Sequence, residues 1–283
     1  MKPRFFRLWH NPAVSLVVIT LAIYSITAGV SLVRQSLAPH FVFLADAFLH
    51  SQLELASIPD PPYDLTFFNE HWYVSFPPLP ALLLMPIVAI RGLSTSDIAF
   101  SVIAGGLCVG AMALALARLN RAIGGFHADG SITWLALLLG FGTPLWYCAA
   151  LGSVWFTAHV IAAGCLCLYV REVLGDNRPF LAGVWLGLGF LARAPVLLAF
   201  PLSLAVRRDR NRSLRDTARF ALSLAMGVAP MVLAQAAYNY GRFGSLLEFG
   251  YRWMNSPDTL LQRQATWGQF NARFLPENLY TLL

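Results

Sequence analysis

Carboxylates and arginines occupy separate parts of this 283-residue chain. Residues 35–75 contain five of the fourteen acidic residues and no lysine or arginine, whereas the later segments supply arginines. A carboxylate can accept a proton from an attacking hydroxyl, and a guanidinium can hold phosphate oxygens through its fork of N–H donors. The segregation therefore predicts a site where acids of the 35–75 segment meet arginines of a later one. The five acids are Asp46, Glu54, Asp60, Asp64 and Glu70.

Arg193 carries the clearest functional signal in the sequence. A charge inside a long apolar run is costly, so such residues usually face a polar interior and mark a ligand or a pathway. The alternative is an ion pair within a helix bundle, but the apolar segments contain hardly any acids. We therefore predict that Arg193 binds a phosphate group. Arg242, just beyond the last apolar segment, is a second candidate, and its alternative role is to reach the membrane interface.

Asp64 and Asp46 are the candidates for the proton acceptor. At about 100° per residue, the apolar residues around Asp46 fall on one side and Asp46 and His50 on the other, which predicts an amphipathic helix lying in the membrane interface. Asp46 is equally explained as part of the solvated side of that helix, and Asp64 as the cap of a turn after Pro61 and Pro62. The apolar side consists of Phe41, Leu44, Phe48 and Leu55.

No metal site is predicted, although a divalent cation is left open. His40, His50, His71 and the nearby acids lie in one segment, but their spacing matches no tight ligand motif. His50 and His71 are the ligands to test if a metal is present. The four cysteines lie inside apolar segments and are interpreted as packed thiols rather than a disulfide framework.

The composition is that of a membrane protein. Hydrophobic residues make up 57% of the chain and charged residues only 12%, whereas charged residues are about a quarter of soluble domains. The arginines are bunched between apolar runs and form no basic face, which argues against a nucleic-acid partner. Lys2, Arg4 and Arg7 precede an apolar stretch too long for a signal peptide, so we expect a retained first span.

The apolar segments predict an all-α, polytopic bundle forming a single transmembrane domain over 1–283. Seven spans place the basic N-terminus and the arginine cluster at 207–219 together in the cytoplasm. They also place four other arginines on the outer side, against the positive-inside rule, namely Arg118, Arg121, Arg171 and Arg178. In the alternative, segments 76–92 and 180–206 are re-entrant, because prolines break both. The expected spans are about 12–34, 77–92, 97–118, 132–149, 153–171, 179–206 and 216–237, with outer loops 35–76 and 238–283.

Four stretches resemble the polyprenyl-phosphate-sugar-dependent membrane glycosyltransferases of the C superfamily, which include protein O-mannosyltransferases and aminoarabinose transferases. Segment 63–80 (YDLTFFNEHWYVSFPPLP) is similar to their acidic loop and Pro-rich helix entry, and it favours Asp64 as the base. Three later stretches agree in order. These are 152–159 (GSVWFTAH), 187–195 (GLGFLARAP), and 238–245 (YNYGRFGS) with 248–251 (EFGY).

The chain also departs from the family pattern. An essential acid is usual just after the first span, where residues 37–41 here read LAPHF. Phe76 stands where aminoarabinose transferases have a lysine. Relatives usually continue with further spans, so we expect a truncated or minimal version.

The resemblance implies an enzyme of the bacterial inner membrane with a cytoplasmic N-terminus. It would move a sugar from a polyprenyl-phosphate donor, with inversion, to a hydroxyl of an envelope lipid, glycan or protein. Aromatic rings that could stack on the sugar are those of Trp72, Tyr73 and Trp155, besides Trp146 and Tyr147, although most membrane Trp and Tyr are interface anchors. The alternative is a degenerate transferase that only binds the lipid carrier, or a transporter.

Overall fold

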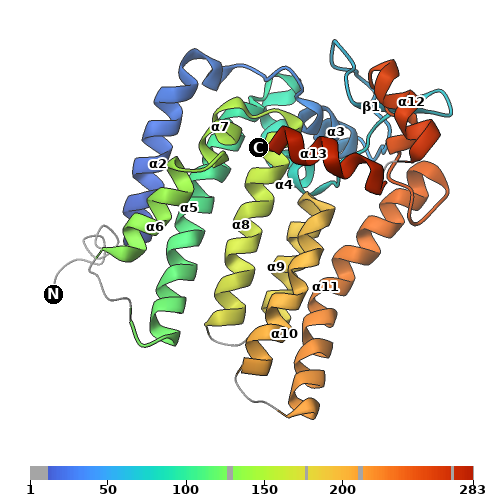
Figure 1. Ribbon diagram of the computed structural model, residues 1–283. Coiled ribbons are helices and arrows are strands. Elements are labelled where there is room, and N and C mark those ends of the chain that lie inside the picture. The colour runs from blue at the N-terminus through green and yellow to red at the C-terminus, as the bar shows by residue number, and fades with distance from the viewer. Residues whose placement is uncertain (1–11, 126–129, 176–177, 210–212, 269–270, 283) are drawn as a thin grey trace.

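The protein is a bundle of helices with a small two-stranded hairpin at one end (Figure 1). The computed structural model describes residues 12–125, 130–175, 178–209, 213–268 and 271–282. Lys2, Arg4, Arg7, Arg210 and Arg212 lie outside the described residues. The helices are α2 (Pro12–Ala28), α3 (His40–Leu49), α4 (Leu79–Arg91), α5 (Asp97–Ala122), α6 (Ser131–Phe141), α7 (Leu145–Leu151), α8 (Val154–Leu174), α9 (Pro179–Ala192), α10 (Phe200–Asp209), α11 (Leu214–Phe243), α12 (Asp258–Trp267) and α13 (Leu275–Leu282).

Short 3-10 turns and the hairpin complete the chain. Strands β1 (Leu65–Phe68) and β2 (His71–Val74) pair antiparallel around a turn in which Asn69 and Glu70 have positive φ. This hairpin was not anticipated from the sequence, where the segment was interpreted as a loop. The 3-10 turns are η1 (Gly29–Val33), η2 (Gly92–Ser94), η3 (Ala194–Ala199), η4 (Tyr251–Trp253) and η5 (Ala272–Phe274).

Four described helices are long and apolar enough to cross a bilayer, and a bent pair would make a fifth. The four are α2 with η1, α5, α8 and α11, and the pair is α6 with α7, which meet at 51°. The prediction of a polytopic helix bundle is therefore confirmed in its coarse form. The expected seven simple spans are not found, because segments 77–92 and 179–206 consist of shorter helices.

Segment 77–92 returns to the end of the bundle from which it starts. The Gln35 amide nitrogen donates to the carbonyl of Leu93 at 2.6 Å, and the Ser96 hydroxyl donates to the carbonyl of Arg34 at 2.6 Å. The residues that follow the first helix therefore touch the residues that begin α5. The segment between them, which contains α4, therefore starts and finishes at the same end of the bundle, which agrees with the re-entrant alternative.

Segment 179–206 also turns back. It begins beside Glu172, at the far end of α8, and its second half returns so that the Tyr169 hydroxyl donates to the carbonyl of Ala199 at 3.1 Å. The chain therefore rises through α9, breaks at Arg193 and descends through η3 and α10 (Figure 1). Pro195 contributes to the break, because in a continued helix it would have no N–H to donate to the carbonyl of Leu191 and its ring would clash with that carbonyl.

With both segments folded back, the C-terminal ends of α5 and α8 and the start of α11 lie at one end of the bundle (Figure 1). The hairpin, α3, α12 and α13 lie at the other (Figure 1). The arrangement removes the conflict with charge placement that seven crossings would create.

Helix α3 forms where the periodicity predicts it, but its apolar side packs on protein. Phe41 and Leu44 are buried in one cluster with Leu55, Leu84 and Val154. The expected placement of this face in the membrane interface is not what these residues show, because α4 and the start of α8 cover it.

Helices α9 and α11 approach closely through glycines. A methyl group on Gly183 would collide with the carbonyl oxygen of Leu224, and one on Gly227 with that of Phe180. Small residues allow such backbone contact between helices in a membrane, and the contact fixes α9 against the long α11.

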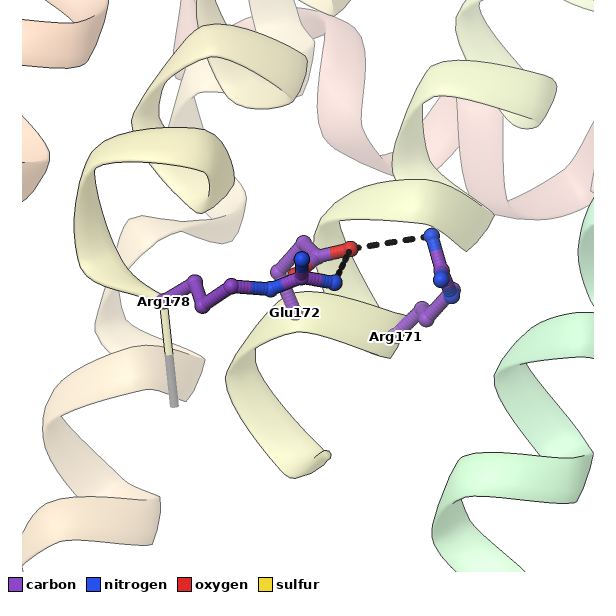
Figure 2. A network of polar contacts seen from close by, with 3 residues as sticks. All are labelled: Arg171, Glu172 and Arg178. Carbon is purple, nitrogen blue, oxygen red and sulfur yellow. Dashed lines mark hydrogen bonds and ion pairs between the residues drawn. The ribbon is translucent and has the colours of Figure 1, made fainter. Parts of the chain in front are cut away.

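A buried carboxylate fixes the other end of α9. Glu172, at the end of α8, accepts hydrogen bonds from Arg171 at 3.0 Å and from Nε of Arg178 at 2.7 Å (Figure 2). The Glu172 side chain is only 2% exposed. Because Arg178 immediately precedes α9, this ion pair joins α8 to the helix that carries Arg193.

We expect Glu172→Gln to lower the free energy of unfolding by about 3 kcal/mol, because it leaves two guanidiniums facing each other around an uncharged buried group. The matched control is Glu277→Gln, whose 2.6 Å ion pair with Arg263 is exposed on both sides and should contribute less than about 1 kcal/mol. Thermal unfolding of both variants in detergent measures the difference. Equal melting temperatures would contradict the role assigned to Glu172.

Candidate functional site

Arg193 lies at the tip of the re-entrant segment, where the backbone leaves α9 in an extended conformation. Its NH2 group donates to the carbonyl of Trp155 at 3.3 Å and contacts Nε2 of His159 at 2.8 Å. Because a guanidinium only donates, Nε2 of His159 must be the acceptor, and the ring proton sits on Nδ1. The Nε atom of Arg193 is buried without a hydrogen-bond partner among the described residues. The guanidinium therefore keeps a donor without a partner within the described part of the chain.

The guanidinium faces a cleft of about 610 Å³. The segment after α11 forms one wall and α12 contributes to the rim. Glu248, Tyr251 and Arg252 bring a carboxylate, a phenol and a second guanidinium to the same space as Arg193. Two cations and one anion leave the cleft with net positive charge. The described lining is Pro77, Arg193, Ala194, Pro195, Leu247, Glu248, Phe249, Tyr251, Arg252, Gln264 and Gly268.

Glu248 is held in place rather than free. One carboxylate oxygen accepts the N–H of Gly250 at 2.8 Å, and the other lies 3.4 Å from Nε of Arg252. Burial raises the pKa of the Tyr251 phenol, and the charges of Arg193 and Arg242 oppose that shift. Tyr251 therefore lies within electrostatic reach of both arginines predicted from the sequence.

Asp64 lines a second cavity of about 500 Å³. Its backbone adopts positive φ, and its N–H donates to the carbonyl of Asn255 at 3.0 Å. The side chains of Trp155 and Ser256 line the same cavity as its carboxylate. Burial raises the pKa of Asp64, and interactions with these two side chains oppose the rise.

Trp155 joins the two cavities. Its carbonyl accepts from Arg193, and it lines the same cavity as Asp64. Three residues singled out from sequence, Asp64, Trp155 and Arg193, are thus connected through one tryptophan.

The other predicted site residues lie elsewhere. Asp46 pairs with His50 at 3.8 Å on α3, and neither belongs to the described lining of the two cavities. Trp72 and Tyr73 pack in the hairpin, Trp72 against Phe67 and Tyr73 against Phe243.

Arg242 is 3% exposed and ties the end of α11 to the hairpin. Its NH1 donates to the carbonyl of Val74 at 2.5 Å and its NH2 to the side-chain oxygen of Asn239 at 3.0 Å. Its guanidinium carbon also lies 3.7 Å from the ring centroid of Tyr238. Through these contacts Arg242 holds the end of α11 against the hairpin. The described lining of the cleft does not include Arg242.

Trp146 and Tyr147 line a separate cavity of about 480 Å³ between α2 and α7, whose described lining carries no charged side chain. His71 is exposed at the start of β2. No group of three or more His, Cys, Asp or Glu within the described ranges is arranged to hold a metal ion.

Sequence reasoning did not single out Glu248, Arg252 or His159 as site residues. Glu248 and His159 lie in stretches that carry the family resemblance, so their position there was an available signal. Arg252 had none, because its role depends on how the segment after α11 folds over the hairpin.

Comparison of the chain with protein-family models, with curated proteins and with solved structures gives no match.

His40 positions the segment that carries Asp64. Its Nε2 lies 2.6 Å from the carbonyl of Tyr63, so Nε2 carries the proton, and the ring is fully buried. Burial lowers the pKa of His40 from 6.5 to about 4. The folded protein therefore holds this imidazole in its neutral form.

The free energy of unfolding should fall as pH drops from about 6.5 to about 4, by up to about 3 kcal/mol. In that window the unfolded chain binds a proton at His40 that the folded chain excludes. His40→Gln keeps a donor for the Tyr63 carbonyl but does not titrate, so this part of the pH dependence should disappear. Melting temperatures of both proteins between pH 4 and 7 test this, and parallel curves would contradict it.

Proposed function

We propose that the protein is a membrane glycosyltransferase that moves a sugar from a polyprenyl-phosphate donor to a hydroxyl group. The observation that carries the proposal is the Arg193 guanidinium, with its buried and unpartnered Nε, facing a positively charged cleft. Arginine forks match phosphate oxygens, and Arg252 supplies a second positive charge in the same cleft. The family resemblance supports the same assignment independently.

The reaction would be a displacement at the anomeric carbon. The oxygen of the acceptor hydroxyl attacks that carbon while a carboxylate takes the hydroxyl proton. The bond between the anomeric carbon and the phosphate oxygen breaks, and its electron pair leaves with the phosphate. Arg193 and Arg252 stabilise the developing negative charge. Asp64 is the proposed base, since Trp155 connects it to Arg193, whereas Asp46 lacks such a connection in the described contacts.

The membrane orientation is part of the proposal. The turns rich in arginine would lie in the cytoplasm together with the N-terminus, and the cleft would open on the outer face of a bacterial inner membrane. The acceptor would then be an envelope lipid, glycan or protein.

A lipid-carrier binder without catalysis is the second candidate. It is favoured by the departure from the family pattern at residues 37–41, which read LAPHF where an essential acid is usual. Binding of polyprenyl phosphate without sugar release would support this candidate.

Arg193→Gln should reduce transfer by about 100-fold or more and weaken donor binding, because it removes a charged donor from the leaving phosphate. Asp64→Asn should reduce transfer by about 100-fold while donor binding remains. Asp46→Asn, a matched control at a partly buried carboxylate outside the described lining of both cavities, should stay within a few-fold of the parent. Transfer and donor binding in purified protein separate these cases, and full turnover in both Arg193→Gln and Asp64→Asn would eliminate the mechanism.

Trp155→Phe should move the acidic limb of the pH–rate profile to higher pH. The substitution removes the side-chain interaction that lowers the pKa of Asp64, but it leaves the backbone carbonyl that Arg193 contacts. A base with a higher pKa is protonated at a higher pH, so activity is lost earlier on acidification. An unchanged acidic limb would show that Asp64 is not the titrating base.

A further inference from the structure

Two cavities of opposite charge are linked by Trp155, which lines the Asp64 cavity and whose carbonyl accepts from Arg193 in the other. The Arg193 cleft contains two arginines and one glutamate. The described lining of the Asp64 cavity contains two carboxylates, Asp64 and Asp258, and no arginine or lysine. A phosphate is attracted to the first and repelled by the second, so the two cavities select different chemical groups.

The lining of the Asp64 cavity suits neutral carbohydrate. Carboxylates and an amide can bond sugar hydroxyls, and aromatic rings can cover the C–H face of a sugar. Tyr63 contributes a ring that is 64% exposed, and Trp155 a second one. The described lining is Tyr63, Asp64, Trp155, Asn255, Ser256, Pro257 and Asp258.

The wall of the Asp64 cavity is held in place by hydrogen bonds between residues that are distant in sequence. The N–H of Asn255 donates to the carbonyl of Leu65 at 2.7 Å, and its side chain donates to the carbonyl of Pro62 at 2.9 Å. Thr66 pairs with Met254 in an isolated β-bridge and donates to the carbonyl of Gly250 at 3.0 Å. Segment 250–256 therefore extends the hairpin and holds both walls before any ligand arrives, which limits the ordering cost of binding.

We propose that the Asp64 cavity is a binding site for a neutral, phosphate-free carbohydrate. Its role as the acceptor site rests on the proposed function, whereas the binding itself does not. The sugar stacks on Tyr63, and the Asp258 carboxylate accepts from its hydroxyls. An acceptor bound there presents a hydroxyl to Asp64, while the phosphate of the donor stays in the neighbouring cleft.

The test measures saccharide binding by saturation-transfer NMR on the full chain in lipid nanodiscs, because maltoside detergents would themselves occupy a sugar site. The probes are glucose, galactose, mannose, N-acetylglucosamine and their β1–4 disaccharides. At least one should bind, and Tyr63→Ala should weaken binding about tenfold through loss of the ring contact. The exposed Tyr63 ring makes this variant mild for folding, and its backbone carbonyl still accepts from His40.

Asp258→Asn should weaken binding of the same saccharide, and Arg252→Gln, the control in the other cavity, should leave it unchanged. Absence of binding by every probe, wild-type affinity in both Tyr63→Ala and Asp258→Asn, or an equal loss in Arg252→Gln would each overturn the proposal. Binding of polyprenyl phosphate, with and without Arg193→Gln, is measured in parallel. If donor binding depends on Arg193 but no saccharide binds, this inference alone is wrong. If a saccharide binds but donor binding does not depend on Arg193, only the proposed function is wrong.

Discussion

A guanidinium among apolar helices needs polar partners, and the position of Arg193 follows from that constraint. The break at Ala194 and Pro195 frees the chain to turn, so the side chain lies at the tip of α9 instead of along an unbroken helix. The carbonyl of Trp155 and the ring of His159 satisfy one nitrogen. Arg193 also lines a cleft. Glu172 and the glycine contact of α9 with α11 place the tip of α9 that carries it.

The end of the bundle that carries the cleft is assembled from segments far apart in sequence. Arg242 joins the end of α11 to Val74 in the hairpin, and Asn255 joins the segment after α11 to Leu65. His40 joins the start of α3 to Tyr63. The residues around Asp64 are therefore positioned by contacts from three directions, although most of them belong to no helix or long strand.

Much of the helical architecture was predictable, because apolar length and charge placement are local properties of the chain. Apolar length alone does not distinguish a crossing from a return, since α4 is as apolar as the spanning helices. Seven crossings would place Arg118 and Arg171 outside, against the positive-inside rule, and this conflict was the signal that favoured returning segments. The contacts of Gln35 with Leu93 and of Tyr169 with Ala199 agree with it. Arg193 was singled out because a charge inside a long apolar run is rare, and its binding of a phosphate stays a prediction. Glu248 and Arg252 were missed because their position depends on long-range folding of an irregular segment.

The prolines at the start of α4 have a further consequence. A helix that begins inside a protein exposes amide hydrogens that no preceding turn can satisfy, and in a bilayer water is scarce. Pro77, Pro78 and Pro80 remove three of these donors at and just before the first turn of α4, which begins at Leu79. The chain can thus start a helix in the apolar cluster that contains Leu79, Ile161 and Leu191 without an unmet donor at each of these positions.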